Sequence, residues 1–310
     1  MPTVRARLEA EGVTVVWLPL GLDAKSYELV ADFDDASITA GGVQVTTKTV
    51  RNAAAVVHRR WRLSPPLAPV GLTLEGDPEQ FGQREWTASL DYALWLWSHS
   101  ESVVPWGNLP GRTHGRMTLC RLARESGLRV PPTALATRHS RAIPRPAVTK
   151  AIATNESVYE DVYFPTTRLS SEDLERLMAE RSPCPNLVQK AIAAPLEVRV
   201  VYSFGNVGAV ALRRTDGNSP VDIRYAPCVV RSPWRLSDAI SARLRDLAAR
   251  ACLSLYTADF VIDEAGEYWV VDVTPEGCLG GLDDEEQTLV TSYVEGIREV
   301  AYAPSVSISA

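Results

Sequence analysis

The sequence predicts a mixed α/β (α+β) protein whose C-terminal part is built on an antiparallel sheet. Two observations lead to this prediction. Residues 1–110 combine helical and strand patterns, as a small α/β domain does. From residue 197 onward, strand patterns are joined by turn signals such as Phe204-Gly205-Asn206, which is typical of antiparallel pairs. The 310 residues allow two or three packed domains, and we place them at 1–110, 111–192 and 193–310.

In the first domain the apolar periodicity predicts a helix, then a buried strand, a hairpin around Gly41-Gly42 and a second buried strand. A proline-rich loop and a strongly apolar, aromatic helix follow. These elements span residues 4–11, 13–18, 37–48, 53–57, 64–69 and 85–98.

The middle domain begins with a helix that Gly127 stops. A strand and a small α/β subdomain follow, whose own helix starts at Ser171-Glu172-Asp173, residue types that favour a helix N-terminus. The expected helices span residues 113–126 and 171–180, and the expected strands span 131–137, 147–150, 158–164 and 186–189.

The last domain contains two predicted strand pairs separated by an amphipathic helix, and a further helix closes it. The second pair flanks the turn Asp263-Glu264-Ala265-Gly266. The strands span residues 198–203, 207–213, 258–262 and 268–273, and the helices span 237–252 and 284–300.

Composition excludes several classes of protein. A net charge of −6 argues against a general nucleic-acid binder, and no apolar run approaches the ~18 residues of a membrane span. The five cysteines are scattered without Cys-x-x-Cys spacing, and the four histidines form no helical pair, so we expect no zinc site. The first residues lack a signal-peptide core. We therefore expect a cytoplasmic protein with reduced thiols.

Acidic residues mark both strands of the second predicted hairpin. Asp259 and Asp272 lie on partner strands, and Thr274 lies two residues beyond Asp272, on the same face. Grouped carboxylate oxygens are ligands that Mg²⁺ prefers, and a magnesium ion held by two acids usually also contacts nucleotide phosphates. The other interpretation is a hairpin with two acids at solvated strand ends.

The order of motifs resembles that of the ATP-grasp ligases and, at family level, the ATP-grasp maturases of graspetides (microviridin-type peptides). A lysine after a strand, a strand with a connector, a further strand and then the acid pair occur in that order. The segments that carry the resemblance are Val57-His58-Arg59-Arg60-Trp61, residues 127–133, Glu197-Val198-Arg199, Val221-Asp222-Ile223-Arg224 and residues 266–277. It covers roughly residues 5–300. No single motif is specific, but their order and spacing together are.

The resemblance implies an ATP-grasp fold, with an N-terminal pre-ATP-grasp α/β domain, a small lid subdomain and a C-terminal antiparallel-sheet catalytic domain. It implies ATP and Mg²⁺ as cofactors. By resemblance, Lys150 binds phosphates, and Arg116 stands where relatives usually have a further phosphate-binding lysine. Backbone groups of the hinge read adenine and an acid accepts from the ribose. The residues at these hinge and ribose positions are Gln189, Lys190, Ile192 and Glu197.

Three arginines match positions where relatives keep basic groups facing the reaction centre: Arg199, Arg213 and Arg224. Fixed guanidiniums there stabilise developing charge on phosphoryl and carbonyl oxygens. Arg213 and Arg224 are equally compatible with the surface, and Arg214 is an alternative to Arg213.

The expected metal ligands depart most from the family. The usual order is aspartate, glutamate and asparagine, whereas this chain has Asp259, Asp272 and Thr274. Aspartate has one methylene less reach than glutamate, and threonine lacks an amide carbonyl. Glu276, two residues further on, is a candidate to compensate.

The resemblance implies an ATP-dependent ligase that activates a carboxylate as an acyl phosphate and forms ester or amide macrocycles in a ribosomal precursor peptide. The partners it implies are a leader and core peptide, neither nucleic acid nor membrane, and a second copy in a homodimer. Two alternatives stay open. One is a ligase that joins an amino acid to a small molecule or free peptide. The other is a catalytically impaired ATP-grasp protein that binds peptides, which the altered metal ligands motivate.

Overall fold

The computed structural model describes residues 2–16, 27–31, 35–53, 89, 92–94, 96–97, 115–136, 145–150, 166–179, 186–214, 223, 229–275 and 287–302. The chain forms two compact units. The first comprises Met1–Thr113, Cys252–Ser254 and Val294–Ala310, and the second comprises His114–Ala251 and Leu255–Tyr293.

The first unit contains an antiparallel sheet in the order β1-β2-β3. Its strands are β1 Tyr27–Ala31, β2 Ala36–Ala40 and β3 Val43–Thr46. Gly41 and Gly42 have φ values of 56° and 77°, which suit the tight turn between β2 and β3. The hairpin predicted around these glycines is thus confirmed. Ile38 of β2 is fully buried, and Trp97 Nε1 donates to the carbonyl of Ala36 at 3.2 Å.

Helix α1 Pro2–Ala10 confirms the first predicted helix, and α2 Thr47–Arg51 follows β3 directly. The strand predicted over 13–18 is wrong over 13–16, which have no regular structure, and Val16 is 56% exposed. An apolar run forms a strand only where a neighbour takes up its hydrogen bonds, and residues 13–16 pair with no described strand. The strand predicted over 53–57 lies outside the described residues from 54 onward.

The second unit contains a four-stranded antiparallel sheet, called here the small sheet, in the order β4-β7-β5-β6. Its strands are β4 Thr133–Ala136, β5 Ala147–Lys150, β6 Thr167–Leu169 and β7 Asn186–Lys190. Helix α5 Ser171–Ala179 packs on it, and Leu174 joins Ala147 and Val188 in a buried cluster. Ser170 caps α5, because its Oγ accepts from the backbone N–H of Asp173 at 3.0 Å. The predicted strand over 158–164 lies outside the described residues.

The second unit also contains a five-stranded antiparallel sheet, called here the large sheet, in the order β10-β9-β8-β11-β12. Its strands are β8 Leu196–Ser203, β9 Asn206–Arg214, β10 Val229–Pro233, β11 Leu255–Ile262 and β12 Tyr268–Thr274. Both predicted strand pairs are confirmed as hairpins, β8 with β9 and β11 with β12.

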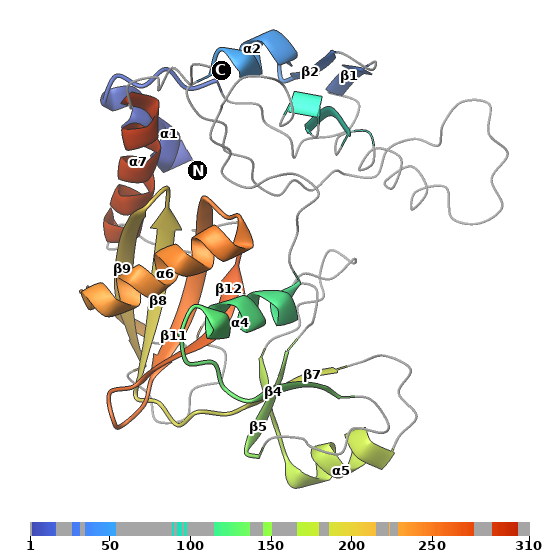
Figure 1. Ribbon diagram of the computed structural model, residues 1–310, viewed down its shortest axis with the longest axis vertical. Helices are drawn as coiled ribbons and strands as arrows, with labels where there is room; N and C mark the ends of the chain where they lie inside the picture. The colour runs from blue at the N-terminus through green and yellow to red at the C-terminus, as the bar shows by residue number, and fades with distance from the viewer. Residues whose placement is uncertain are drawn as a thin grey trace, which may run out of the picture. The chain divides into compact units, whose positions relative to one another are not determined.

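Helices α4 Arg116–Glu125 and α6 Asp238–Ala251 lie together in front of the large sheet (Figure 1). Tyr256 of β11 donates its hydroxyl to the carbonyl of Leu244 in α6 at 2.7 Å, and its ring stacks on Tyr202 of β8. Gly127 follows the end of α4 with a φ of 79°, the left-handed conformation that is common after a helix, which confirms the predicted stop. This face of the sheet forms the core of the unit.

The first part of α7 (Gln287–Tyr302), up to Tyr293, packs on one end of the opposite face of the large sheet. Ser203, at the end of β8, donates its hydroxyl to the carbonyl of Tyr293 at 3.0 Å. Gly208 of β9 lies so close to α7 that a Cβ placed on it would be 2.7 Å from the Ser292 Cβ. Glycine is therefore required for this contact.

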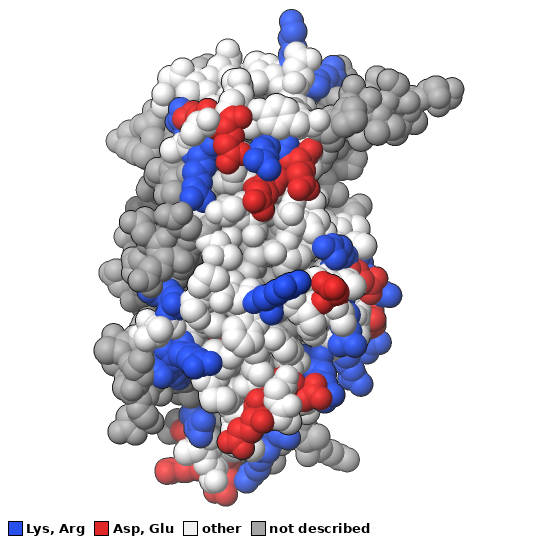
Figure 2. All heavy atoms as spheres, turned by 90° about the vertical axis from the view of Figure 1, so that its left-hand side faces the viewer, with Lys and Arg blue, Asp and Glu red and all other residues white. Residues whose placement is uncertain are grey.

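Among the described residues, no helix has the length and apolar character of a membrane span. Figure 2 shows Lys and Arg side chains interspersed with Asp and Glu side chains over the described part of one face. This mixture of signs agrees with the small net charge of the chain.

Candidate functional site

The candidate site is a row of charged side chains across three neighbouring strands of the large sheet. Asp272 of β12 lies opposite Asp259 of β11, and Asp259 lies opposite Arg199 of β8. Directly opposed residues of antiparallel strands point to the same face, with Cα atoms about 4.5–5.5 Å apart. The row therefore places two acids and one arginine side by side.

The burial of β8 shows that this row is less deeply buried than the rest of the strand. Leu196, Val198 and Val200 are buried on the helix-covered face, whereas the alternate residues Glu197 and Arg199 are only partly buried. Beyond them, where α7 lies over the same face, the alternation ends and β8 is buried on both sides. Hence the charged row occupies the less deeply buried end of this face, called here the open end, whereas the other end is packed under α7.

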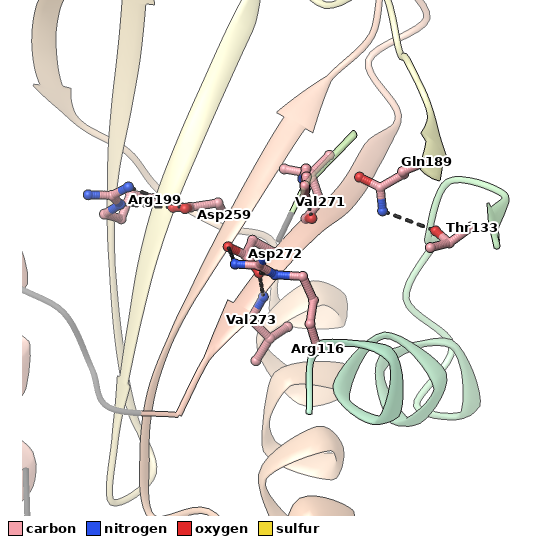
Figure 3. Close-up of polar contacts among 9 residues, drawn as sticks. Arg116, Thr133, Gln189, Arg199, Asp259, Val271, Asp272 and Val273 are labelled. Atoms are coloured by element: carbon pink, nitrogen blue, oxygen red, sulfur yellow. Dashed lines mark hydrogen bonds and ion pairs between the residues drawn. The ribbon is translucent and has the colours of Figure 1, made fainter. Parts of the chain in front are cut away.

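Arg199 and Asp259 form a two-pronged ion pair across β8 and β11 (Figure 3). Arg199 Nε donates to Asp259 Oδ1 at 2.8 Å, and the guanidinium Nη2 donates to Oδ2 at 3.2 Å. About a third of the Asp259 side chain, 32%, remains exposed. The pair is thus fixed in geometry but reachable from solvent.

Arg116, the first residue of α4, forms a second two-pronged pair with Asp272 (Figure 3). The Nε–Oδ1 and Nη2–Oδ2 distances are 2.8 and 3.1 Å. Only 9% of the Arg116 side chain and 14% of the Asp272 side chain are exposed. Breaking such a buried pair by removing one partner costs about 3–5 kcal/mol, because the other charge is left buried.

Lys150, the last residue of β5, reaches from the small sheet to β12 of the large sheet. Its Nζ donates to the carbonyl of Val271 at 2.7 Å. Val271 is the extra residue of a β-bulge, since Phe260 pairs with Val270 while the preceding residue of β11, Asp259, pairs with Asp272. A bulged residue drops out of the regular ladder. The bulge thus provides the acceptor that holds Lys150.

Burial and charge shift the pKa values at this point. Burial lowers the pKa of the Lys150 ammonium from its ordinary value, and the neighbouring Asp272 carboxylate partly opposes this. For Asp272, burial raises the pKa, but Arg116 and Lys150 outweigh burial, so the net pKa is lowered and the carboxylate stays ionised. Cys120 of α4 is also close: burial, together with Asp272, raises the pKa of its thiol to about 11.

Glu197 of β8 pairs with Arg214, the last residue of β9. Glu197 lies opposite Leu212, so Arg214, two residues further along β9, is on the face of the charged row. Arg213 is exposed and points to the other face. The structure therefore brings Arg214, the alternative, rather than Arg213 to the site. Arg224 lies outside the described residues.

The predicted hinge residues lie at the end of β7 and just beyond it. Gln189 is almost fully buried, and its Nε2 donates to Thr133 Oγ1 at 3.1 Å, which ties β7 to β4 (Figure 3). The backbone N–H of Lys190 donates to the carbonyl of Pro132 at 2.8 Å, and its side chain is exposed. Ile192 is half-buried. The bond from Gln189 to Thr133 was not predictable from the sequence, because a threonine in a strand carries no signal for its partner.

The donor set of the row fits a hydrated magnesium ion better than an all-protein cage. Among the described residues, no three His, Cys, Asp or Glu side chains form a metal-binding group. Thr274 is half-buried and lies one same-face pair beyond the acids, opposite Thr257. Glu276 lies outside the described residues. Asp259, which is partly exposed, is the acid that can accept an ion carrying its own waters and phosphates.

Comparison with known proteins relates the fold to a group of solved structures. No family model matches the chain, and no curated protein matches its sequence. Among solved structures, the macrocyclase MdnC of Microcystis aeruginosa MRC, bound to precursor peptide MdnA, superposes with a TM-score of 0.70. It is 18% identical, over 97% of this chain and 94% of that one.

Two further structures agree. The ATP-grasp ligase PsnB with a minimal precursor gives a TM-score of 0.69 at 17% identity, over 96% of this chain and 94% of that chain. A RiPP-associated ATP-grasp ligase of Chryseobacterium gregarium, in complex with ADP and a leader and core peptide, gives 0.67 at 16% identity, over 95% and 91%. The predicted fold is thus confirmed: this chain has the ATP-grasp fold along nearly its whole length.

Proposed function

We propose that this protein is an ATP-dependent ligase that forms ester or amide bonds within a ribosomal precursor peptide. The observation that carries the proposal is the convergence of Lys150, Arg116 and Arg199 on two acids at the open end of the large sheet. Solved structures with the same fold hold ADP with magnesium and precursor peptides. The charged row is therefore a suitable place for a phosphate chain and a peptide carboxylate to meet.

The reaction has two steps. A carboxylate oxygen of an Asp or Glu side chain attacks the γ-phosphorus of ATP, ADP leaves, and an acyl phosphate forms. A hydroxyl or amine of the same peptide then attacks the carbonyl carbon, phosphate leaves, and the nucleophile loses its proton. The overall change in the peptide is the loss of one water for each bond.

The residues of the charged row suit the charges that develop. Lys150 and Arg116 are buried cations, whose attraction to phosphate oxygens is little weakened by water. Arg199 and Arg214 lie on the open face, where a guanidinium can stabilise the oxyanion of the second step. To Gln189, Lys190 and Ile192 we assign the binding of adenine, and to Glu197 the binding of the ribose.

Magnesium, when bound at Asp259, neutralises phosphate charge. The chain's own contribution there is to hold the carboxylate in place through Arg199.

A nucleotide-binding protein with impaired ligase activity is a second candidate. The observation that favours it is the pairing of both acids with arginine, which competes with metal coordination. A ligase for small-molecule substrates is a third candidate function for the same site.

The deciding experiment measures ADP release by the purified full-length chain in the presence of Mg²⁺. It is run with and without a short peptide encoded beside the gene, and the peptide is then weighed by mass spectrometry. We expect peptide-stimulated ADP release and loss of the mass of water from the peptide. A peptide with its Asp and Glu residues changed to Asn and Gln is the matched control and should stimulate nothing.

Binding of ATP without turnover, with every peptide tested, would contradict the ligase proposal and support the impaired protein. Loss of water only when a free amino acid is added would point to the small-molecule ligase.

A further inference from the structure

The two neighbouring acids of the charged row differ in how far they are available to a metal ion. They lie opposite each other on β11 and β12, an arrangement in which two carboxylates could share bound cations. Asp259 is 32% exposed, whereas Asp272 is 14% exposed. The difference in exposure comes from the groups packed around Asp272.

Arg116 holds Asp272 from a rigid position. It is the first residue of α4, a helix anchored through the buried side chains of Leu119 and Ala123. Both oxygens of Asp272 accept from one guanidinium, at 2.8 and 3.1 Å, and the side chain of Arg116 is nearly buried. A metal that took Asp272 would leave this buried guanidinium without its carboxylate, which is strongly unfavourable.

Lys150 adds a second buried cation at the same place. Its ammonium, fixed on the carbonyl of Val271, interacts electrostatically with Asp272 and with Arg116. A divalent ion on Asp272 would share one negative charge with two fixed positive charges at low local dielectric. The protein has thus already supplied the positive charge that a metal would bring there.

Asp259 is different in spite of its own arginine. Both its oxygens accept from Arg199, but about a third of the side chain, 32%, is exposed to solvent. Mg²⁺ usually keeps several waters and is held by one or two carboxylates plus phosphates, so one accessible carboxylate is sufficient.

We propose that Arg116 withholds Asp272 from metal binding, so that this chain binds a single divalent cation with its nucleotide, through Asp259. Arg116 supplies the fixed positive charge on the Asp272 side. The proposal rests on the nucleotide binding assumed in the proposed function.

The test counts bound Mn²⁺ and bound ADP per chain in the same sample, by equilibrium dialysis of the full-length protein with saturating ADP. Mn²⁺ serves as the probe because electron paramagnetic resonance measures its free concentration directly. We expect one ADP and one Mn²⁺ per chain. One ADP with two Mn²⁺ overturns the single-cation inference and leaves the proposed function intact. Absence of ADP binding overturns the proposed function and the inference with it.

Variants separate the roles of the two acids and of Arg116. Asp259→Asn should reduce the count of ADP-dependent Mn²⁺ from one to zero, while Asp272→Asn should leave it at one. Loss of the ion in Asp272→Asn would overturn the assignment.

Arg116→Met should raise the count to two, because Asp272 becomes available, and an unchanged count of one would contradict the role of Arg116. Arg121→Met, an exposed arginine of the same helix that pairs with Glu125, is the matched control and should keep the count at one. Thermal melting of each variant shows whether it is folded, and the comparison of the two acids stands without the Arg116 variant.

Discussion

The two ends of one face of the large sheet use the same strands for different purposes. At one end Ser203 and Gly208 lie under α7, and the residues there are small or bonded to the helix backbone. At the other end Glu197 and Arg199 are partly buried, and their charged side chains pair with residues of neighbouring strands. Side chains alternate between the two faces of the sheet at both ends, and α7 packs on the end that holds Ser203 and Gly208.

Residues at the two ends of β8 should therefore contribute differently, those under α7 to stability and those of the charged row to ligand binding. Under α7 a change of one methyl group meets packed atoms and should affect folding. In the open part the same strand tolerates polar groups, and a change there should affect ligand binding and turnover more than the fold. Substitutions at the two ends can therefore be designed to give opposite readouts.

The largest effect is expected from Lys150→Ala at the open end. Removing the buried ammonium deletes the phosphate contact that we propose for it, so ATP turnover should fall by about 100-fold or more. Turnover is measured as ADP release, with thermal melting to confirm that the variant is folded. Lys48→Ala, an exposed lysine of α2, is the matched control and should behave like the parent chain. Unchanged turnover in Lys150→Ala would remove it from the phosphate site.

The comparison of the two faces is sharpened by adjacent arginines of β9. Arg214→Ala should lower peptide-stimulated turnover by about 10- to 100-fold, because Arg214 lies on the open face and pairs with Glu197. Arg213→Ala, one residue away on the other face, should lower it by less than about twofold, an effect too small to be a lost transition-state contact. Steady-state kinetics of peptide-stimulated ADP release, measured on both variants, tests this prediction. A larger effect at Arg213 would contradict the placement.

Gly208→Ala tests the covered end. The new Cβ would lie 2.7 Å from the Ser292 Cβ and 3.1 Å from the Thr288 carbonyl oxygen. Such overpacking should lower the free energy of unfolding by about 1–3 kcal/mol, measured by urea denaturation.

Ser292→Gly removes the side chain that the new methyl meets, so it provides an internal control for Gly208→Ala. The double variant should be more stable than the sum of the single changes predicts, by about 1 kcal/mol. Simple additivity would show that the two positions are not in contact.

The smallest effect is expected at the turn of the β11–β12 hairpin. Asp263 accepts from the backbone N–H groups of Ala265 and Glu267 and from Trp269 Nε1 at 2.8 Å. Asp263→Ala should lower the melting temperature by about 2–4 °C. Glu264→Ala, an exposed neighbour with the same loss of charge, should have almost no effect.

The effect of Asp263 should also depend on pH. The hydrogen bond from Trp269, followed by those from the turn backbone, lowers the pKa of the Asp263 carboxyl in the folded protein. A lowered pKa stabilises the fold above the unfolded pKa of about 3.9, and this stabilisation is lost as the pH falls through the folded pKa. The difference in melting temperature between parent and Asp263→Ala should therefore shrink below about pH 4. A difference that is constant with pH would show that the carboxylate charge is irrelevant.

Much of the fold was predictable because most elements carry a local signal. The apolar periodicity of α4 with Gly127 after it, and the turn at Asp263, each contain enough information to place an element. Strand β6 was not predicted, because its three residues are mostly exposed and have no apolar pattern. Its position depends on pairing with β5, which is a non-local contact.

The site was predictable only in part, for the same reason. Asp259 and Asp272 could be identified as a pair, but their arginine partners come from other elements. Arg213 and Arg214 are adjacent in sequence, and only the register of β9 against β8 decides which one faces the row. Such register is set by the whole sheet rather than by either residue.

The bulge at Val271 changes which residues of β12 face the core. Before it, Val270 points to the core opposite Phe260; after it, Val273, three residues later, does so as well. The alternation of inward and outward side chains is therefore shifted by one residue at the bulge. This shift turns Asp272 away from the core. A strand of the same composition with strict alternation would carry this acid on the apolar side. One inserted residue therefore allows a strand of the core to carry a charged side chain on the opposite face of the sheet.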